Sequence, residues 1–168
     1  MSANHKKTFN KPIYYIYGTE SCLIDEFLIE LKDTVLTPGF ESMNYHCYYG
    51  DTLDLTDALM TIKTMPAFSD KRLVIIKNAS SLKADQKKAM LEYLQDPSPT
   101  SILVFVSTAA KLPRNEDKFL KAIKKNGVVK AFRPPREEGA LQWLATEASK
   151  EGKTISNEAR KNLIELTG

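Results

Sequence analysis

The sequence predicts an α/β domain in which a five-stranded parallel sheet lies between helices. Five short runs of β-branched, aromatic and aliphatic residues alternate with amphipathic helical segments between residues 12 and 133, and this alternation is typical of parallel sheets. The fourth run, SILVFVS at residues 101–107, is continuously apolar, which indicates a strand covered on both faces. After residue 133 two helical segments follow without a strand between them.

The first strand is expected at residues 13–17, where the run IYYIY ends at Gly18. Thr19 or Ser21 is expected to cap the following helix, whose apolar residues recur at helical spacing. These residues are Leu23, Ile24, Phe27, Leu28, Leu31 and Val35. A Thr-Pro-Gly turn ends this helix, and a second strand is expected at residues 44–49.

The next helix is short and breaks at a proline. Its apolar positions are Leu55, Leu59 and Ile62. Pro66 has no backbone donor and disfavours helix in the residue before it. Met65 and Phe68 therefore lie at a break between a helix and a strand, and two interpretations are open: they plug the core beneath the strand end, or they are offered to a partner.

The remaining elements follow in regular alternation. They are a third strand at 73–76, a helix from about 83 to 95, the fourth strand at 101–107, a basic helix carrying Phe119, Leu120 and Ile123, and a fifth strand at 128–132. The domain organisation predicted from this pattern is a polar leader at residues 1–11, the α/β domain at 12–133, and the beginning of a small helical domain at 134–168. Because two helices make a poor core alone, we expect the rest of that second domain to lie outside these residues.

The composition is that of an ordinary soluble globular protein, with 42% hydrophobic and 27% charged residues and a formal net charge of +3. No apolar run approaches the roughly 20 residues that span a bilayer, and the first residues lack the apolar core of a signal peptide. Cys22 and Cys47 have no CxxC or histidine neighbours that would indicate a metal site. We expect a cytoplasmic protein with reduced thiols, no bound metal and no membrane contact.

Gly18 stands where a nucleotide-binding α/β protein begins its phosphate loop. The motif GxxxxGK[ST] supplies backbone amides for phosphate, a lysine for the terminal phosphates and a hydroxyl for magnesium. In this chain the last three positions are Leu23, Ile24 and Asp25, which would repel a triphosphate. The third strand is followed by a lysine and an asparagine where magnesium would need acidic residues, and neither histidine has a spaced ligand partner. The sequence predicts a degenerate P-loop, no cofactor and no catalytic residues.

Four segments together resemble the delta subunit family of the bacterial DNA polymerase III clamp loader. They are YYIYGTESCLIDEFL, NYHCYYGD, TMPAFSDKRLVIIKNA and SILVFVSTAAKL, and the resemblance runs from about residue 12 to the end. It implies a RecA-like AAA+ module that has lost its phosphate loop, followed by the start of helical domain II, with a collar domain beyond residue 168. It also implies a subunit that does not hydrolyse ATP.

The same resemblance implies partners and a binding site. A delta subunit binds the ring-shaped sliding clamp (beta) and opens it for loading onto primed DNA. It works with ATPase (gamma/tau) and delta-prime subunits in the polymerase holoenzyme. It would therefore contact DNA only indirectly, through the complex. The family's hydrophobic clamp-binding wedge falls here on Met65, Pro66, Ala67 and Phe68. Many relatives have two bulky apolar residues at this point, whereas this chain has Ala67 beside Phe68.

Two other functions stay open from the residues alone. One is a degenerate nucleotide-binding regulator, against which Leu23, Ile24 and Asp25 argue. The other is a DNA-binding module that uses lysines gathered on two helix faces. These are Lys83, Lys87 and Lys88 on the first helix and Lys121, Lys124 and Lys125 on the second. Solvated helix surfaces would show the same lysine pattern.

Overall fold

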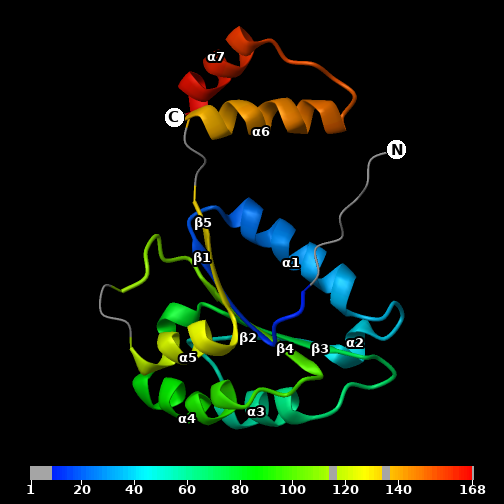
Figure 1. The fold of residues 1–168 in the computed structure, drawn as a ribbon, viewed down its shortest axis with the longest axis vertical. Coiled ribbons are helices and arrows are strands. Elements are labelled where there is room, and N and C mark those ends of the chain that lie inside the picture. The colour runs from blue at the N-terminus through cyan, green and yellow to red at the C-terminus, as the bar shows by residue number, and fades with distance from the viewer. Residues whose placement is uncertain (1–8, 114–116, 134–136, 168) are drawn as a thin grey trace. The chain divides into compact units, whose positions relative to one another are not determined.

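The computed structural model describes residues 9–113, 117–133 and 137–167, and the chain divides into two compact units, residues 1–132 and 133–168. Most of the predicted leader and the first residues of the predicted second domain, 134–136, lie outside the described residues. Phe9, at the end of that leader, packs edge-on against Phe27 with ring centroids 5.5 Å apart. The first unit is the α/β domain that the sequence predicts (Figure 1).

Its sheet has five parallel strands in the order β2-β3-β4-β1-β5. The strands are β1 (Ile13–Gly18), β2 (Tyr45–Tyr49), β3 (Arg72–Lys77), β4 (Ser101–Ser107) and β5 (Val128–Phe132). Tyr15 of β1 lies opposite Phe105 of β4 and Val129 of β5. The three central strands are buried along nearly their whole length, whereas the edge strands β2 and β5 are half-buried. The continuous apolar runs therefore mark the central strands.

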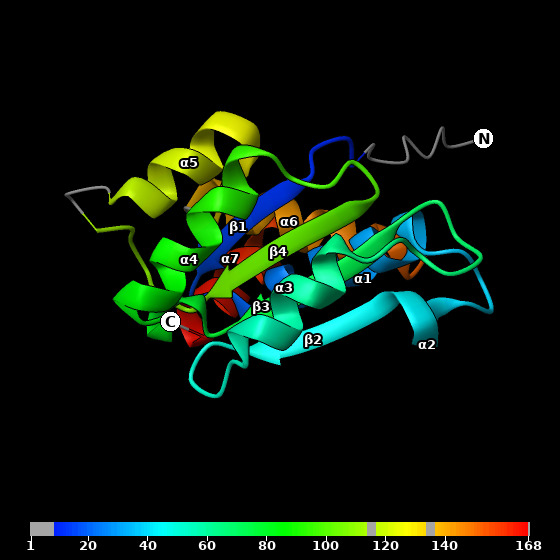
Figure 2. The same ribbon diagram turned by 90° about the horizontal axis from the view of Figure 1, so that it is seen from below.

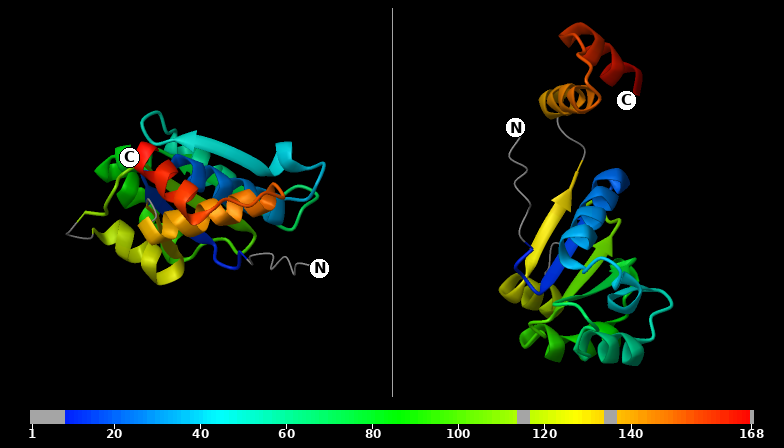
Figure 3. Two further views of the ribbon diagram at one scale, coloured as in Figure 1. Left: turned by 90° about the horizontal axis from the view of Figure 1, so that it is seen from above. Right: turned by 90° about the vertical axis from the view of Figure 1, so that its right-hand side faces the viewer.

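Helices cover both faces of this sheet. On one face α1 (Ser21–Val35) buries Ile24, Phe27, Leu28 and Leu31 against the strands. On the other face lie α3 (Leu55–Lys63), α4 (Ala84–Gln95) and α5 (Lys118–Asn126). Figure 2 shows these three helices in front of the sheet, and the right-hand view of Figure 3 separates the two helix layers. Each helix is amphipathic because its apolar residues recur every three or four positions.

Two local features differ from the sequence-based expectation. Neither Thr19 nor Ser21 caps α1: the N-cap residue is Glu20, and no side chain bonds the helix start. The turn after β1 is tight, so the Ser21 N–H bonds the Thr19 carbonyl instead (3.1 Å). A short helix, α2 (Glu41–Asn44), precedes β2, and its four residues are too few to give a helical period in the sequence.

The second unit consists of α6 (Glu137–Lys150) and α7 (Asn157–Thr167). Gly152, with φ +69°, ends the first helix, and the Lys153 N–H bonds the Ala148 carbonyl (2.8 Å). Ser156 caps α7 by accepting the Ala159 N–H (3.2 Å). Arg160 donates to the Leu141 carbonyl (3.1 Å) and ties the two helices together. Within the described part of the chain, no helix has the length and apolarity that a bilayer crossing requires.

Candidate functional site

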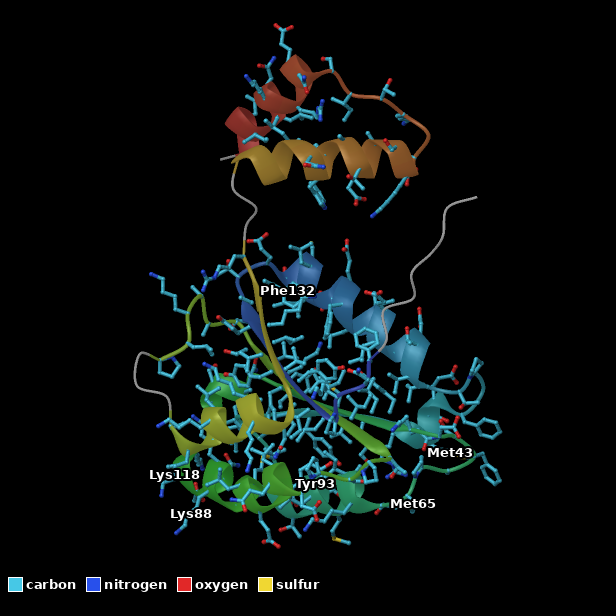
Figure 4. All side chains as sticks on the ribbon, viewed as in Figure 1. Met43, Met65, Lys88, Tyr93, Lys118 and Phe132 are labelled. Atoms are coloured by element: carbon cyan, nitrogen blue, oxygen red, sulfur yellow. The ribbon has the colours of Figure 1, made fainter. Side chains whose placement is uncertain are left out.

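The loop between α3 and β3, residues 64–71 and here called the wedge loop, lies at the amino ends of the parallel strands. Met65 and Phe68 are the most exposed large apolar side chains of this loop, at 69% and 77% of their surface. Pro66 and Ala67 between them are half-buried. The interpretation that Met65 and Phe68 plug the core beneath the strand end is therefore wrong. Figure 4 shows Met65 at the rim of the domain in this view.

Asn44, the last residue of α2, holds the middle of this loop. Its side chain is fully buried. Its Oδ1 accepts the Ala67 N–H (2.8 Å), and its Nδ2 donates to the Ala67 carbonyl (2.8 Å) and to the Phe40 carbonyl (3.0 Å). Both peptide groups of Ala67 are thus bonded on the inner side of the loop. Backbone groups on the inner side of a loop need such partners because unpaired groups are costly away from water.

Arg72, the first residue of β3, holds the loop nearer its start. The guanidinium is buried and donates through Nη1 to the Thr61 carbonyl (3.0 Å) and through Nη2 to the Met65 carbonyl (3.2 Å). Ser101 at the start of β4 donates to the Ile62 carbonyl (2.7 Å). The last carbonyls of a helix have no partner within the helix, so β3 and β4 satisfy those at the end of α3.

Phe68 adopts a left-handed backbone conformation, with φ +51°. Such a conformation costs a residue with a side chain on the order of 1–2 kcal/mol, so neighbouring contacts must hold it. The Phe68 ring lies on the Phe40 ring with centroids 5.4 Å apart and an interplanar angle of 32°. Thr37 Oγ1 donates to Ser69 Oγ (2.9 Å). The segment around α2, which also carries Asn44, therefore supports the wedge loop together with Arg72.

Sequence reasoning found the exposed residues of this site and missed its supports. Phe40, Asn44 and Arg72 all contact the loop, and none belongs to it. Met43 of α2 is about half exposed. An exposed apolar pair on a braced loop, flanked by further apolar side chains, fits a complementary apolar pocket on another protein.

The residues predicted to form a degenerate P-loop begin at the opposite end of the sheet, where β1 ends. The turn between β1 and α1 contains only Thr19 and Glu20. A cavity of about 140 Å³ lies beside it and is lined by Gly18, Ile24 and Asp25 among others. Leu23 packs against the apolar layer under α1. A Cβ on Gly18 would lie 1.7 Å from the Phe132 carbonyl oxygen, so the end of β5 closes the space above this turn.

The titratable residues of the described chain do not gather into a metal site: no group of three or more histidine, cysteine, aspartate or glutamate side chains could hold an ion. His46 lies on β2, and burial, together with the positive charge of Arg72, lowers its pKa. Cys22 is exposed and Cys47 half-buried.

Exposed lysines lie along the outer surface of α5, and α4 contributes one exposed lysine, Lys88. α5 turns Phe119, Leu120 and Ile123 inward and leaves its lysines exposed. These exposed lysines are Lys118, Lys121, Lys124 and Lys125. Lys88 of α4 and Lys118 of α5 appear at the same corner of the domain in Figure 4. Lys87 forms an ion pair with Asp117 (3.5 Å).

Comparison with known proteins decides the family. The sequence model described as "DNA polymerase III, delta subunit" matches residues 14–133. The chain belongs to the DNA polymerase III delta subunit family. A relative, DNA polymerase III subunit delta of Bacillus subtilis (strain 168), is 28% identical over 169 residues, which covers 96% of this chain and 48% of the relative. The resemblance seen in the sequence is confirmed.

Solved structures agree with this assignment. The Bacillus subtilis DNA clamp loader delta protein superposes with a TM-score of 0.75 and 27% identity, covering 91% of this chain and 47% of that one. A DNA polymerase III gamma subunit-related protein from Thermotoga maritima gives a TM-score of 0.56 at 15% identity, with coverages of 86% and 50%, and this match concerns the fold alone. The predicted arrangement of a five-stranded parallel sheet between helices, followed by further helices, is confirmed. The chain spans about half the length of the relatives it matches.

Proposed function

We propose that this delta-family chain binds the sliding clamp (beta) through Met65 and Phe68 and opens its ring for loading onto primed DNA. The observation that carries the proposal is the outward direction of these two side chains, 69% and 77% exposed, from a loop whose backbone is bonded inward. Ala67 has both peptide groups turned to Asn44, which favours Met65 and Phe68 as the inserting pair. Pro66 keeps them apart and fixes the backbone between them.

Energy considerations support a wedge of this size. Burying a methionine and a phenylalanine in a partner's pocket contributes roughly 1.5–3 kcal/mol each, and two such anchors can dominate a protein interface. Binding opens the ring only if the pocket fits the wedge better in the open form than in the closed one, because a ligand shifts an equilibrium by its differential affinity.

The decisive experiment compares clamp binding by the wild type and by a Met65→Ala/Phe68→Ala variant, with the clamp of the same organism. We expect affinity to fall at least about tenfold, which corresponds to about 1.4 kcal/mol, with unchanged circular dichroism and melting. Ile29→Ala is a matched control, because Ile29 is 60% exposed on α1. Equal binding by wild type and double variant would move the contact elsewhere, and no binding by the wild type would refute clamp binding by this chain.

The proposal includes a subunit without ATP hydrolysis of its own, located in the cytoplasm. Ile24 and Asp25 line the cavity at the end of β1, which holds about 140 Å³, and a carboxylate and an aliphatic side chain suit a triphosphate poorly. ATPase (gamma/tau) and delta-prime subunits would supply the hydrolysis and the remaining architecture, and α6 and α7 would begin the second, helical domain. Release of phosphate from ATP by the purified chain would refute this part.

A second candidate function is direct contact with nucleic acid through the lysines of α4 and α5. The observation in its favour is the row of exposed lysines on α5, beside Lys88 of α4. Contacts with phosphates release counterions and make binding steeply salt-dependent. We expect a Lys118→Glu/Lys121→Glu variant to lose duplex binding and its salt dependence. If the wild type shows no salt-dependent binding to the duplex, these lysines form only a hydrated helix surface.

A further inference from the structure

We propose that Asn44 is a positioning residue for partner binding: its side-chain amide fixes the wedge loop in the conformation that inserts. The inference rests on the proposed function, because it concerns the same loop. It adds a residue that lies 23 positions away from Ala67 in the sequence and makes no contact with the partner itself, since its side chain is fully buried.

The hydrogen bonds of Asn44 use the whole amide group. A side-chain amide offers a carbonyl acceptor and two N–H donors. In this chain the Oδ1 accepts from Ala67 at 2.8 Å, while Nδ2 donates to Ala67 at 2.8 Å and to Phe40 at 3.0 Å. An aspartate would place a second oxygen against two carbonyls, and a leucine would pair with none of these groups. Asparagine is therefore chemically specified at this position.

The hydrogen bonds between Asn44 and Ala67 matter because of where Ala67 lies in the wedge loop. Ala67 stands between Pro66 and Phe68, so fixing both of its peptide groups fixes the direction in which the neighbouring side chains leave the loop. Phe68 has φ +51° and is 77% exposed, so few contacts of its own side chain hold that conformation. The same amide bonds the carbonyl of Phe40, whose ring lies against Phe68.

Positioning should improve affinity without adding a contact. A loop that is already ordered loses less conformational freedom when it binds, and reduced ordering cost appears as tighter binding. Loss of the Asn44 amide should therefore weaken binding even though Met65 and Phe68 are still present. The effect should depend on Phe68, because the amide acts through the side chains that the loop presents.

The first test compares Asn44→Leu with Asn126→Leu in the purified protein. Asn126 is a matched control because its Nδ2 also donates to two backbone carbonyls, those of Leu94 (2.7 Å) and Gln95 (3.3 Å), on the α4–α5 side of the domain. We expect clamp affinity to fall about tenfold in Asn44→Leu and to stay within about twofold in Asn126→Leu. Equal losses in both variants, or no loss in Asn44→Leu, would overturn the inference.

A double-mutant cycle separates positioning from general damage. In a Phe68→Ala background, Asn44→Leu should reduce clamp affinity by clearly less than in the wild-type background, because Phe68, one of the two side chains that the loop presents, is gone. Additive losses would mean that Asn44 acts on the whole domain and would contradict positioning. If Asn44→Leu melts below the assay temperature, Asn44→Asp replaces it, since aspartate keeps the acceptor for the Ala67 N–H and loses the donors.

Hydrogen exchange at the Ala67 amide tests the inference without the clamp. We expect this amide to exchange at least about tenfold faster in Asn44→Leu than in the wild type, with amides of the central strands unchanged. Unchanged exchange at Ala67 would overturn positioning even if clamp binding holds. If the wild type fails to bind the clamp but Ala67 exchanges faster in Asn44→Leu, the proposed function would be refuted. The inference that Asn44 fixes the wedge loop would still be supported.

Discussion

Arg72 and Met65 are joined by a hydrogen bond from the Arg72 Nη2 to the Met65 carbonyl, at 3.2 Å. Through it the first residue of a central strand holds the first exposed apolar residue of the wedge loop. The other Arg72 nitrogen, Nη1, bonds the carbonyl of Thr61 in α3. The loop is therefore attached to a buried central strand, and its exposed side chains project from that base.

Replacing Arg72 by lysine should destabilise the domain. A single ammonium reaches at most one of the two carbonyls, and a hydrogen bond to a charged group contributes about 1.5–3 kcal/mol. We expect Arg72→Lys to lower the free energy of unfolding by about 2 kcal/mol, measured by urea denaturation. Arg133→Lys is the control, because Arg133 is exposed and should change stability by less than about 0.5 kcal/mol. Equal small effects would mean that the Arg72 bonds contribute little.

Gly18→Ala should be strongly destabilising. The added Cβ would lie 1.7 Å from the Phe132 carbonyl oxygen, so β1 and β5 would have to separate where they are paired. We expect a loss of about 3 kcal/mol or more in the free energy of unfolding. Gly39→Ala is the matched control: Gly39 has φ +88° with open space around it, so backbone strain alone should cost about 1 kcal/mol. Similar losses in both would contradict a steric cause at Gly18.

Phe40→Ala should weaken clamp binding by about threefold to tenfold, because it removes the ring that lies against Phe68. Phe40 is only half-buried, so the free energy of unfolding should change little. Affinity for the clamp is measured in parallel with Tyr49→Ala. Tyr49 is an aromatic residue about half exposed at the carboxyl end of β2, away from the wedge loop. An equal loss in the Tyr49 variant would show that Phe40 acts only through general stability.

The sequence carried most of the information about the fold and less about the candidate site. The strands were predictable because their apolar runs are short, dense and separated by helical periods. The short helix α2 was not predictable, since four residues are too few to show a helical period. Glu20 as the N-cap of α1 was not predictable either, because the tight turn after β1 overrides the usual preference for a capping side chain. Pro66 revealed the break that exposes Met65 and Phe68. The roles of Asn44 and Arg72 depend on contacts across 23 and 7 residues of chain, and no local pattern encodes contacts of that kind.

Acidification should destabilise the domain through His46. Burial, followed by the positive charge of Arg72, lowers the pKa of His46, while the Met43 backbone and Asp57 oppose this shift in part. Its Nε2 is buried with no hydrogen-bond partner among the described residues, so the folded state favours neutral imidazole. An unfolded histidine takes up a proton near pH 6.5.

Because the unfolded chain then binds more protons, the contribution of His46 to stability is complete above about pH 6.5 and is lost as the pH falls toward its lowered folded pKa. We expect the melting temperature to decrease between about pH 7.5 and about pH 5.5, and to decrease less in His46→Gln, whose side chain does not titrate. Carboxylates contribute equally to both proteins over this range, so the difference between the two slopes isolates His46. Identical slopes would mean that His46 is protonated as easily in the folded domain as in the unfolded chain. A smaller slope in the variant would identify a buried neutral histidine beside Arg72, the residue that holds the wedge loop.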